Sequence, residues 1–200
     1  ALKRNPKFLP ASLRLAALLQ QQEKAQESLA VLRAAEEAGA PAAILQLAWG
    51  DALIVAKEAV KAEEVFRKAL QGDPKSAPAR LGVATALQAQ NKYKEAQAYL
   101  EETLKEMPTT VGLRERLAEV CLALGDKEGA LARYQDELKT GRVTAGLRLA
   151  LSRLALDLGK LELAQSEAKK VQDENPRNAE AAYLLARVHE TRGELGAALA

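Results

Sequence analysis

Residues 94–108, KEAQAYLEETLKEMP, carry the pattern that decides the fold of this chain. Ala96, Leu100 and Leu104 are spaced four residues apart, so they share one face of a helix, and Pro108 ends that helix. A small residue followed by larger apolar residues on the same face predicts a helix that packs closely against a neighbouring helix.

The same pattern recurs along the chain with a period of 34 residues. One period earlier it reads Ala62, Phe66, Leu70 and Pro74, and one period later it reads Ala130, Tyr134 and Leu138. A fixed period without insertions predicts an array of stacked units instead of one central core.

With residue 9 as repeat position 1, the chain divides into five full repeats and two partial ones. The full repeats are residues 9–42, 43–76, 77–110, 111–144 and 145–178. Residues 1–8 match the tail of an earlier repeat, and residues 179–200 match the start of a later one. We therefore expect residues 1–200 to be a single domain that belongs to a longer array.

Each repeat is predicted to form two helices that cross closely. The first helix has a large apolar residue at repeat position 7 and a small residue at position 8, as in Val83 and Ala84. Position 20, in the second helix, is small again in all six repeats: Ser28, Ala62, Ala96, Ala130, Ala164 and Ala198. Small residues let the two backbones approach, while the large residues fill the surrounding space.

Local signals mark the ends of these helices independently of the apolar pattern. The residue before position 1 is a helix-capping type in four repeats: Ser76, Thr110, Thr144 and Asn178. Position 15 holds residues that tolerate a positive φ angle in four repeats: Asn91, Gly125, Gly159 and Gly193. A turn is therefore expected between the two helices of each repeat.

Composition argues against several classes of function. Lys and Arg number 29 and Asp and Glu number 27, so no strong field favours nucleic acid or an acidic membrane. No run of apolar residues is long enough for insertion into a membrane. The chain has one histidine, His189, and one cysteine, Cys121, both at the apolar position 11 of the repeat. We therefore expect no catalytic site, no metal site and no cofactor.

The repeat resembles the tetratricopeptide repeat, a helix–turn–helix unit of 34 residues. The resemblance rests on positions 7, 8, 11, 20 and 24 and on the closing proline, and it covers the whole chain. It implies an all-α fold, a right-handed α-solenoid of antiparallel helix–turn–helix units. Two positions depart from the family. The aromatic residue of position 4 is replaced by Ser12, Gln46, Arg80, Arg114, Arg148 and Ala182, and position 27 holds Thr103 and Glu137 instead of alanine.

In this family the first helices line a concave surface that binds partner proteins. The resemblance therefore implies that positions 2, 5, 6, 9, 12 and 13 face a groove. The candidate partner-binding residues there are Leu13, Leu47, Asp51, Ile54, Val55, Leu81, Glu115, Glu119, Leu122, Leu149, Arg153, Leu156, Tyr183 and Arg187. Asp157 is a further charged residue at these positions.

Two interpretations of these residues stay open. The apolar residues at position 5 either bind a partner with an apolar stripe, such as an amphipathic helix, or are partly covered by the first helix of the next repeat. The charged residues either fix the register of a partner or belong to a solvated face. One subclass is rejected: the modules that bind chaperone carboxyl termini need Lys at position 5 and Asn at position 9, and no repeat has both.

Our leading hypothesis is that the chain is a non-enzymatic scaffold, and the resemblance favours a bacterial type of array. Its partner is expected to be another protein, such as a peptide, an amphipathic helix or a small domain. Bacterial arrays of this kind serve pilus, motility or exopolysaccharide-export machinery of the envelope, and some bind a small GTPase. The alternatives are an accessory domain of a larger enzyme or export protein, and a scaffold that assembles with copies of itself. The sequence leaves the compartment open, with the cytoplasm slightly favoured over the periplasm.

Overall fold

A computed structural model describes residues 9–141 and 143–194, and within them it contains eleven α-helices and no strand. The predicted all-α fold of paired helices is confirmed. Residues 1–8 and Ala198, which the sequence assigns to partial repeats, lie outside the described residues. The helices are α1 (Leu9–Gln21), α2 (Ala25–Glu37), α3 (Ala42–Val55), α4 (Ala59–Gly72), α5 (Ala77–Ala89), α6 (Tyr93–Glu106), α7 (Leu113–Ala123), α8 (Lys127–Leu138), α9 (Ala145–Asp157), α10 (Leu161–Glu174) and α11 (Ala179–Thr191).

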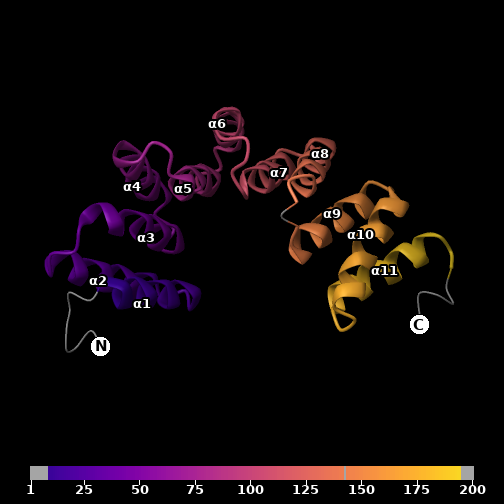
Figure 1. Cartoon of the computed structure of the whole chain (residues 1–200), viewed down its shortest axis with the longest axis horizontal. Helices are drawn as coiled ribbons and strands as arrows, with labels where there is room; N and C mark the ends of the chain where they lie inside the picture. The colour runs from indigo at the N-terminus through magenta and orange to yellow at the C-terminus, as the bar shows by residue number, and fades with distance from the viewer. Residues whose placement is uncertain (1–8, 142, 195–200) are drawn as a thin grey trace. The chain divides into compact units, whose positions relative to one another are not determined.

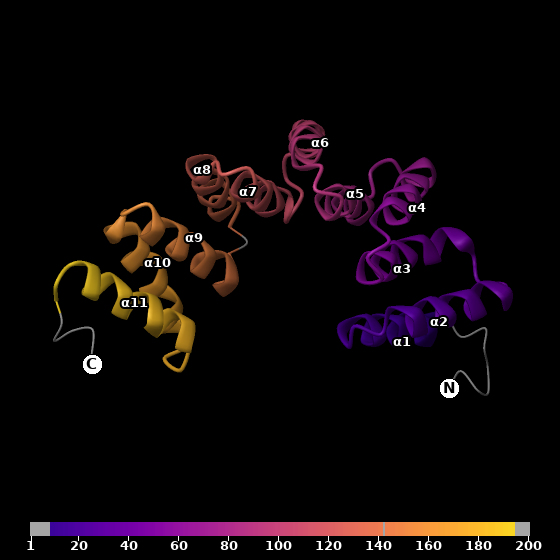
Figure 2. The ribbon, with the colours of Figure 1, turned by 180° about the vertical axis from the view of Figure 1, so that it is seen from behind.

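The chain forms two compact units, residues 1–110 with α1 to α6 and residues 111–200 with α7 to α11. Within each unit every helix packs on the next one in the chain, and the order can be followed in Figure 1 and from behind in Figure 2. First helices also contact one another: α1 packs on α3, α3 on α5, and α9 on α11. Each unit is thus a stack of helix pairs. One continuous solenoid over all five repeats stays a prediction.

The two helices of a repeat cross where repeat positions 8 and 20 meet. Ala16, at position 8, is fully buried, and its carbonyl oxygen accepts a hydrogen bond of 3.1 Å from the Ser28 hydroxyl at position 20. In the fifth repeat the direction is reversed, because the Ser152 hydroxyl donates to the Ala164 carbonyl at 2.7 Å. A side chain as short as serine bridges the two backbones, so the predicted close crossing is present in both units.

Phe66 of α4 fills a space that two glycines leave open. Its side chain is 1% exposed, and it lies against Gly50 of α3 and Gly82 of α5. A Cβ atom added to either glycine would lie 2.4 Å from the aromatic ring. The ring therefore packs directly on the backbones of both first helices, which joins the second repeat to the third.

In three repeats an arginine occupies position 4, where the family has an aromatic residue. Each guanidinium pairs with a glutamate on the second helix of its own repeat. The distances are 2.7 Å for Arg80–Glu106, 3.6 Å for Arg114–Glu137 and 2.5 Å for Arg148–Glu167. Position 4 thus departs from the family in sequence, and the structure shows an ion pair there instead of an aromatic side chain.

Most of the predicted helix caps are confirmed. The side chains of Ser76, Thr144 and Asn178 each accept a hydrogen bond from the backbone amide three residues later. The prediction for Thr110 is wrong, because α7 begins at Leu113 and is preceded by Gly112. Gly112 has a left-handed φ of 83°, which ends any helical conformation before it, so the helix starts later than the repeat pattern suggests.

The turn between the helices has the same backbone conformation in all six repeats. Asn91, Gly125, Gly159 and Gly193 have positive φ angles, as predicted. Glu23 and Lys57 occupy the same repeat position and are also left-handed, with φ of 59° and 62°. The geometry of the repeat therefore imposes this conformation even on side chains that disfavour it.

We predict that Gly82→Ala destabilises the 1–110 unit by about 1–3 kcal/mol, because the added methyl group forces the Phe66 ring out of its packed position. Denaturant unfolding followed by helical circular dichroism measures this. Gly72→Ala is the matched control, since a Cβ atom added there would have no neighbour within 4 Å. Equal midpoints for Gly82→Ala and the native chain would contradict the packing of Phe66 described above.

We predict the opposite effect for Lys57→Gly. Glycine adopts the left-handed conformation of this turn without the steric cost that a lysine carries, so the midpoint of unfolding should rise by the equivalent of about 0.5–1 kcal/mol. Lys57→Ala, which keeps the Cβ atom, should leave the midpoint unchanged. A midpoint for Lys57→Gly at or below that of Lys57→Ala would show that the turn does not strain this residue.

Candidate functional site

Six of the predicted partner-binding residues lie on the first helices of the 1–110 unit, a surface that we call the α1–α3–α5 face. Because these helices contact one another, we expect the position-5 residues to lie in a row across them. All the apolar members are half-buried, and the acidic member is exposed. The face consists of Leu13 on α1, Leu47, Asp51, Ile54 and Val55 on α3, and Leu81 on α5.

Asp51 is the acidic residue within this apolar row. It follows Leu47 by one helical turn and precedes Ile54 by another, so all three share one side of α3. Although Asp51 is exposed, burial of its carboxylate among apolar neighbours raises its pKa. No ion pair to Asp51 is found in the described part of the chain. An unmatched carboxylate therefore lies beside the apolar row.

The other eight predicted residues lie on α7, α9 and α11 of the 111–200 unit, which we call the α7–α9–α11 face. Leu122 and Tyr183 are well exposed, at 38% and 57% of their surface. Leu156 is partly buried against the apolar core of the unit. The face consists of Glu115, Glu119 and Leu122 on α7, Leu149, Arg153 and Leu156 on α9, and Tyr183 and Arg187 on α11.

Leu149 does not fit its expected place on an accessible surface. Its side chain is 6% exposed and packs in a cluster with Ala168, Val171, Ala181 and Leu184. Ala168 and Val171 lie on α10 of the same repeat, and Ala181 and Leu184 lie on α11, so the following repeat contributes to covering Leu149. The alternative that position-5 leucines are covered by a neighbour is therefore correct for this residue, and we leave it out of the binding surface.

Ion pairs organise the charges of the α7–α9–α11 face. Glu119 accepts a hydrogen bond of 2.7 Å from Arg116, and Arg153 pairs with Glu180 of α11. Arg187 donates to the Tyr183 hydroxyl at 2.9 Å, and its guanidinium lies 5.9 Å from the centre of the Tyr183 ring. The sequence interpretation missed Arg116 and Glu180, although their repeat positions 6 and 2 both face the groove in the family.

Tyr134 of α8 is a further residue that the sequence assigned only to the core. It is 4% exposed, and its pKa is raised to about 12 by burial and by the charges of Glu119 and Glu115, against the opposing charge of Arg153. Burial likewise raises the pKa of Glu119, an effect that Arg116 opposes and Glu115 reinforces. The structure thus brings Glu115, Glu119 and Arg153 together around one buried phenol.

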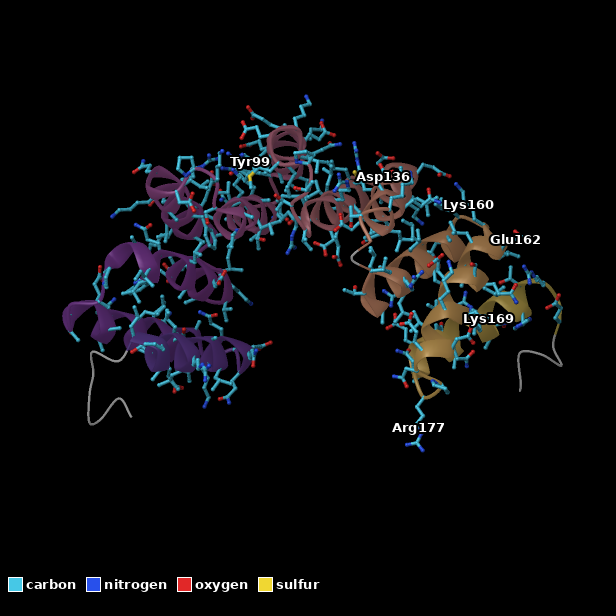
Figure 3. The ribbon with its side chains drawn as sticks, viewed as in Figure 1. Tyr99, Asp136, Lys160, Glu162, Lys169 and Arg177 are labelled. Carbon is cyan, nitrogen blue, oxygen red and sulfur yellow. The ribbon has the colours of Figure 1, made fainter. Side chains whose placement is uncertain are left out.

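A concave feature lies beside α4 and α6 of the 1–110 unit. It is a hollow of about 320 Å³ lined by Arg67, Leu70, Pro74, Arg80, Tyr99, Glu102 and Glu106. Arg67 lies 5.7 Å from the centre of the Tyr99 ring, which Figure 3 labels, and donates to Glu63 at 2.8 Å. Arg80 is held by Glu106. Both arginines of this hollow are therefore already paired with carboxylates.

The described residues offer little for metal chemistry or membrane insertion. No group of three or more His, Cys, Asp and Glu side chains in them is arranged to hold a metal ion. Cys121 is a buried free thiol, and His189 lies 2.7 Å from Glu194. Within residues 9–141 and 143–194, every helix is too short or too polar to cross a bilayer.

Comparison with family models gives a consistent result. One tetratricopeptide repeat model matches residues 53–109 and 87–139, and a second matches residues 13–77 and 149–200. The second model alone covers more than half of the chain. Among curated proteins, no match is found.

Comparison with solved structures shows the same fold. A tetratricopeptide repeat protein from Parabacteroides merdae is 21% identical with a TM-score of 0.75, over 94% of this chain and 73% of that chain. PilW, described as a widely conserved type IV pilus biogenesis factor, is 23% identical with a TM-score of 0.73, over 92% and 86%. YrrB, described as a TPR protein with an unusual peptide-binding site, is 24% identical with a TM-score of 0.62, over 78% and 81%.

We predict that the Tyr134 phenol ionises near pH 12, above the value of about 10 for tyrosine in water. Subtracting the alkaline absorbance titration of Tyr134→Phe from that of the native chain isolates this phenol. Because unfolded Tyr134 loses its proton near pH 10, the stability that it contributes is complete below that pH and falls as the pH rises towards 12.

Helical circular dichroism recorded during the same titration shows whether the chain stays folded. A Tyr134 signal that rises around pH 10 while the helices remain intact would contradict the burial of this phenol.

Proposed function

Because the chain belongs to the tetratricopeptide repeat family, we propose that it is an interaction scaffold without catalytic activity of its own and that its first helices bind a partner protein. One observation carries this proposal. The α1–α3–α5 face presents a row of half-buried apolar side chains from three helices that contact one another. A continuous apolar row on the surface of a stack of helices marks a place where another apolar surface binds.

The half-buried state of Leu13, Leu47 and Leu81 matters for this argument. Their inner atoms pack in the repeat stack and hold each side chain in place, while the outer atoms remain accessible. A partner that covers them gains about 25 cal/mol for each Å² of apolar surface removed from water. Little side-chain entropy is lost on binding, because the rotamers are already restricted.

The shape of the row favours an amphipathic helix as the bound element. Leu47 and Ile54 are two turns apart on α3, with Asp51 between them, and the partner's apolar residues would repeat at similar intervals. Asp51 then lies where a basic or hydrogen-bond-donating side chain of the partner meets it. The described residues do not single out a small GTPase or an envelope component as that partner.

Two of the structural neighbours support the class of function. YrrB is described as having a peptide-binding site, and PilW as a pilus biogenesis factor. A chain with this fold therefore has precedents both for peptide binding and for a place in a bacterial assembly. We propose the same two features here: a peptide or helix as the ligand, and a multiprotein assembly as the setting.

We predict that Leu47→Glu combined with Ile54→Glu weakens partner binding by about tenfold or more, because two carboxylates would be buried against an apolar surface. Native chain and variant are compared as baits in extracts of the source cell, with mass spectrometry of the retained proteins. A retained protein is then purified, and its affinity for both baits is measured by calorimetry. The matched control is Ala34→Glu with Val60→Glu, two exposed positions on the second helices α2 and α4.

Circular dichroism of the double variant decides how the result is interpreted. Helicity near the native value together with lost binding supports the proposal. Lost helicity would place Leu47 and Ile54 in the core and remove the groove. Light scattering of the native chain addresses the self-assembly alternative, since a monomer at high concentration rules it out. A catalytic domain elsewhere in the same polypeptide would instead make this array an accessory domain.

A further inference from the structure

The α7–α9–α11 face has an excess of negative charge that its own arginines do not balance. The three helices contain five arginines and no lysine. Arg114 and Arg148 pair with glutamates of the second helices, away from this face. The other three pair with glutamates of the first helices themselves, namely Arg116 with Glu119, Arg153 with Glu180, and Arg187 with Glu190.

Two carboxylates of the face are left over after this pairing. In the described part of the chain, neither Glu115 of α7 nor Asp157 of α9 has a basic group within ion-pairing distance. Glu115 lies one helical turn before Glu119, on the same side of α7. Asp157 is close enough to Arg187 for their charges to interact. The carboxylates therefore belong to the same face as the paired charges.

Tyr134 of α8 shows that charges of α7 and α9 come close to one another in this unit. Its side chain is 4% exposed. The charges of Glu115 and Glu119 on α7 and of Arg153 on α9 all act on this hydroxyl.

Exposed apolar side chains lie beside these charges. Leu122 is 38% exposed at one end of α7, and Tyr183 is 57% exposed on α11. Leu156 packs against the core but keeps part of its surface accessible. The face thus combines unmatched carboxylates with exposed apolar side chains, which is the complement of a chain segment with basic and apolar side chains.

We propose that the α7–α9–α11 face binds a basic, amphipathic peptide segment of a partner protein, with Glu115 and Asp157 pairing with its lysines or arginines. This inference rests on the proposed function, because it specifies the chemistry of the ligand in one of the two units. Leu122 and Tyr183 then cover the apolar side of the segment.

The hollow beside α4 and α6 is a weaker candidate for a ligand site. Its arginines are neutralised by Glu63 and Glu106, and Arg67 is further occupied by the Tyr99 ring. It therefore lacks the unmatched charge that points to a ligand on the α7–α9–α11 face.

The test uses three fluorescein-labelled helical peptides of equal length and with identical leucine positions, whose polar positions are all Lys, all Glu or all Gln. Binding to the whole chain is measured by fluorescence anisotropy at low salt. The Lys peptide should bind at least about tenfold more tightly than the Glu peptide. Glu115→Gln with Asp157→Asn should weaken the Lys peptide by about three- to tenfold, since each partly exposed ion pair contributes modestly.

The matched control removes two carboxylates elsewhere in the same unit. Asp136→Asn with Glu162→Gln changes the net charge equally, and Figure 3 labels both residues, on the second helices α8 and α10. The control should leave the affinity for the Lys peptide within about twofold, because distant exposed charges are screened. An equal loss in both double variants would mean non-specific attraction and would overturn the proposal.

Equal binding of all three peptides, tighter binding of the Glu peptide, or no binding of the Lys peptide would also overturn it. The proposed scaffold function would still stand after any of these results, provided that Leu47→Glu with Ile54→Glu weakens binding of the native partner. If that variant binds the native partner normally while the Lys peptide binds as expected, the proposed binding role of the α1–α3–α5 face is wrong instead.

Discussion

The two helices of each repeat approach closely because both carry small side chains where they cross. The hydroxyls of Ser28 and Ser152 reach the backbone carbonyl of the opposite helix, which places the two backbones within one short side chain of each other. The second, third and fourth repeats have alanine or glycine at both crossing positions, and all of these residues are buried. Larger side chains at these positions would separate the helices, and every contact between neighbouring repeats depends on that separation.

Once the crossing is fixed, the larger apolar residues fill the space that the small residues leave open. Phe66 shows this most clearly, because it fills the space over Gly50 of its own repeat and Gly82 of the next. At the junction between the second and third repeats, one aromatic ring thus lies between two backbones. A stack made of such junctions has no central core, so its stability is a sum of local contacts between neighbours.

The sequence predicted the helix pairs, the small-residue crossing and most caps because those features repeat with the chain and depend on local chemistry. It failed at Thr110, where Gly112 two residues later takes a left-handed conformation and delays the start of α7. It also failed to foresee the ion pairs of Arg80, Arg114 and Arg148, since their glutamates occupy three different repeat positions. Periodicity finds what repeats and misses contacts that differ from one repeat to the next.

The candidate surface was predicted less completely, for a related physical reason. Repeat position 5 faces the groove on average, but whether a leucine there stays accessible depends on how the next repeat packs, and α10 and α11 cover Leu149. The role of Tyr134 depends on charges brought from α7 and α9, which no single stretch of sequence shows.

The distribution of arginines links the fold to the charge of the binding surface. Arg114 and Arg148 replace the family's aromatic residue and pair with Glu137 and Glu167 of the second helices. Because those carboxylates are buried, leaving either of them without its arginine would be costly, so the arginines are not free to turn towards the groove. The α7–α9–α11 face therefore keeps an acidic excess that follows from how the repeats are held together.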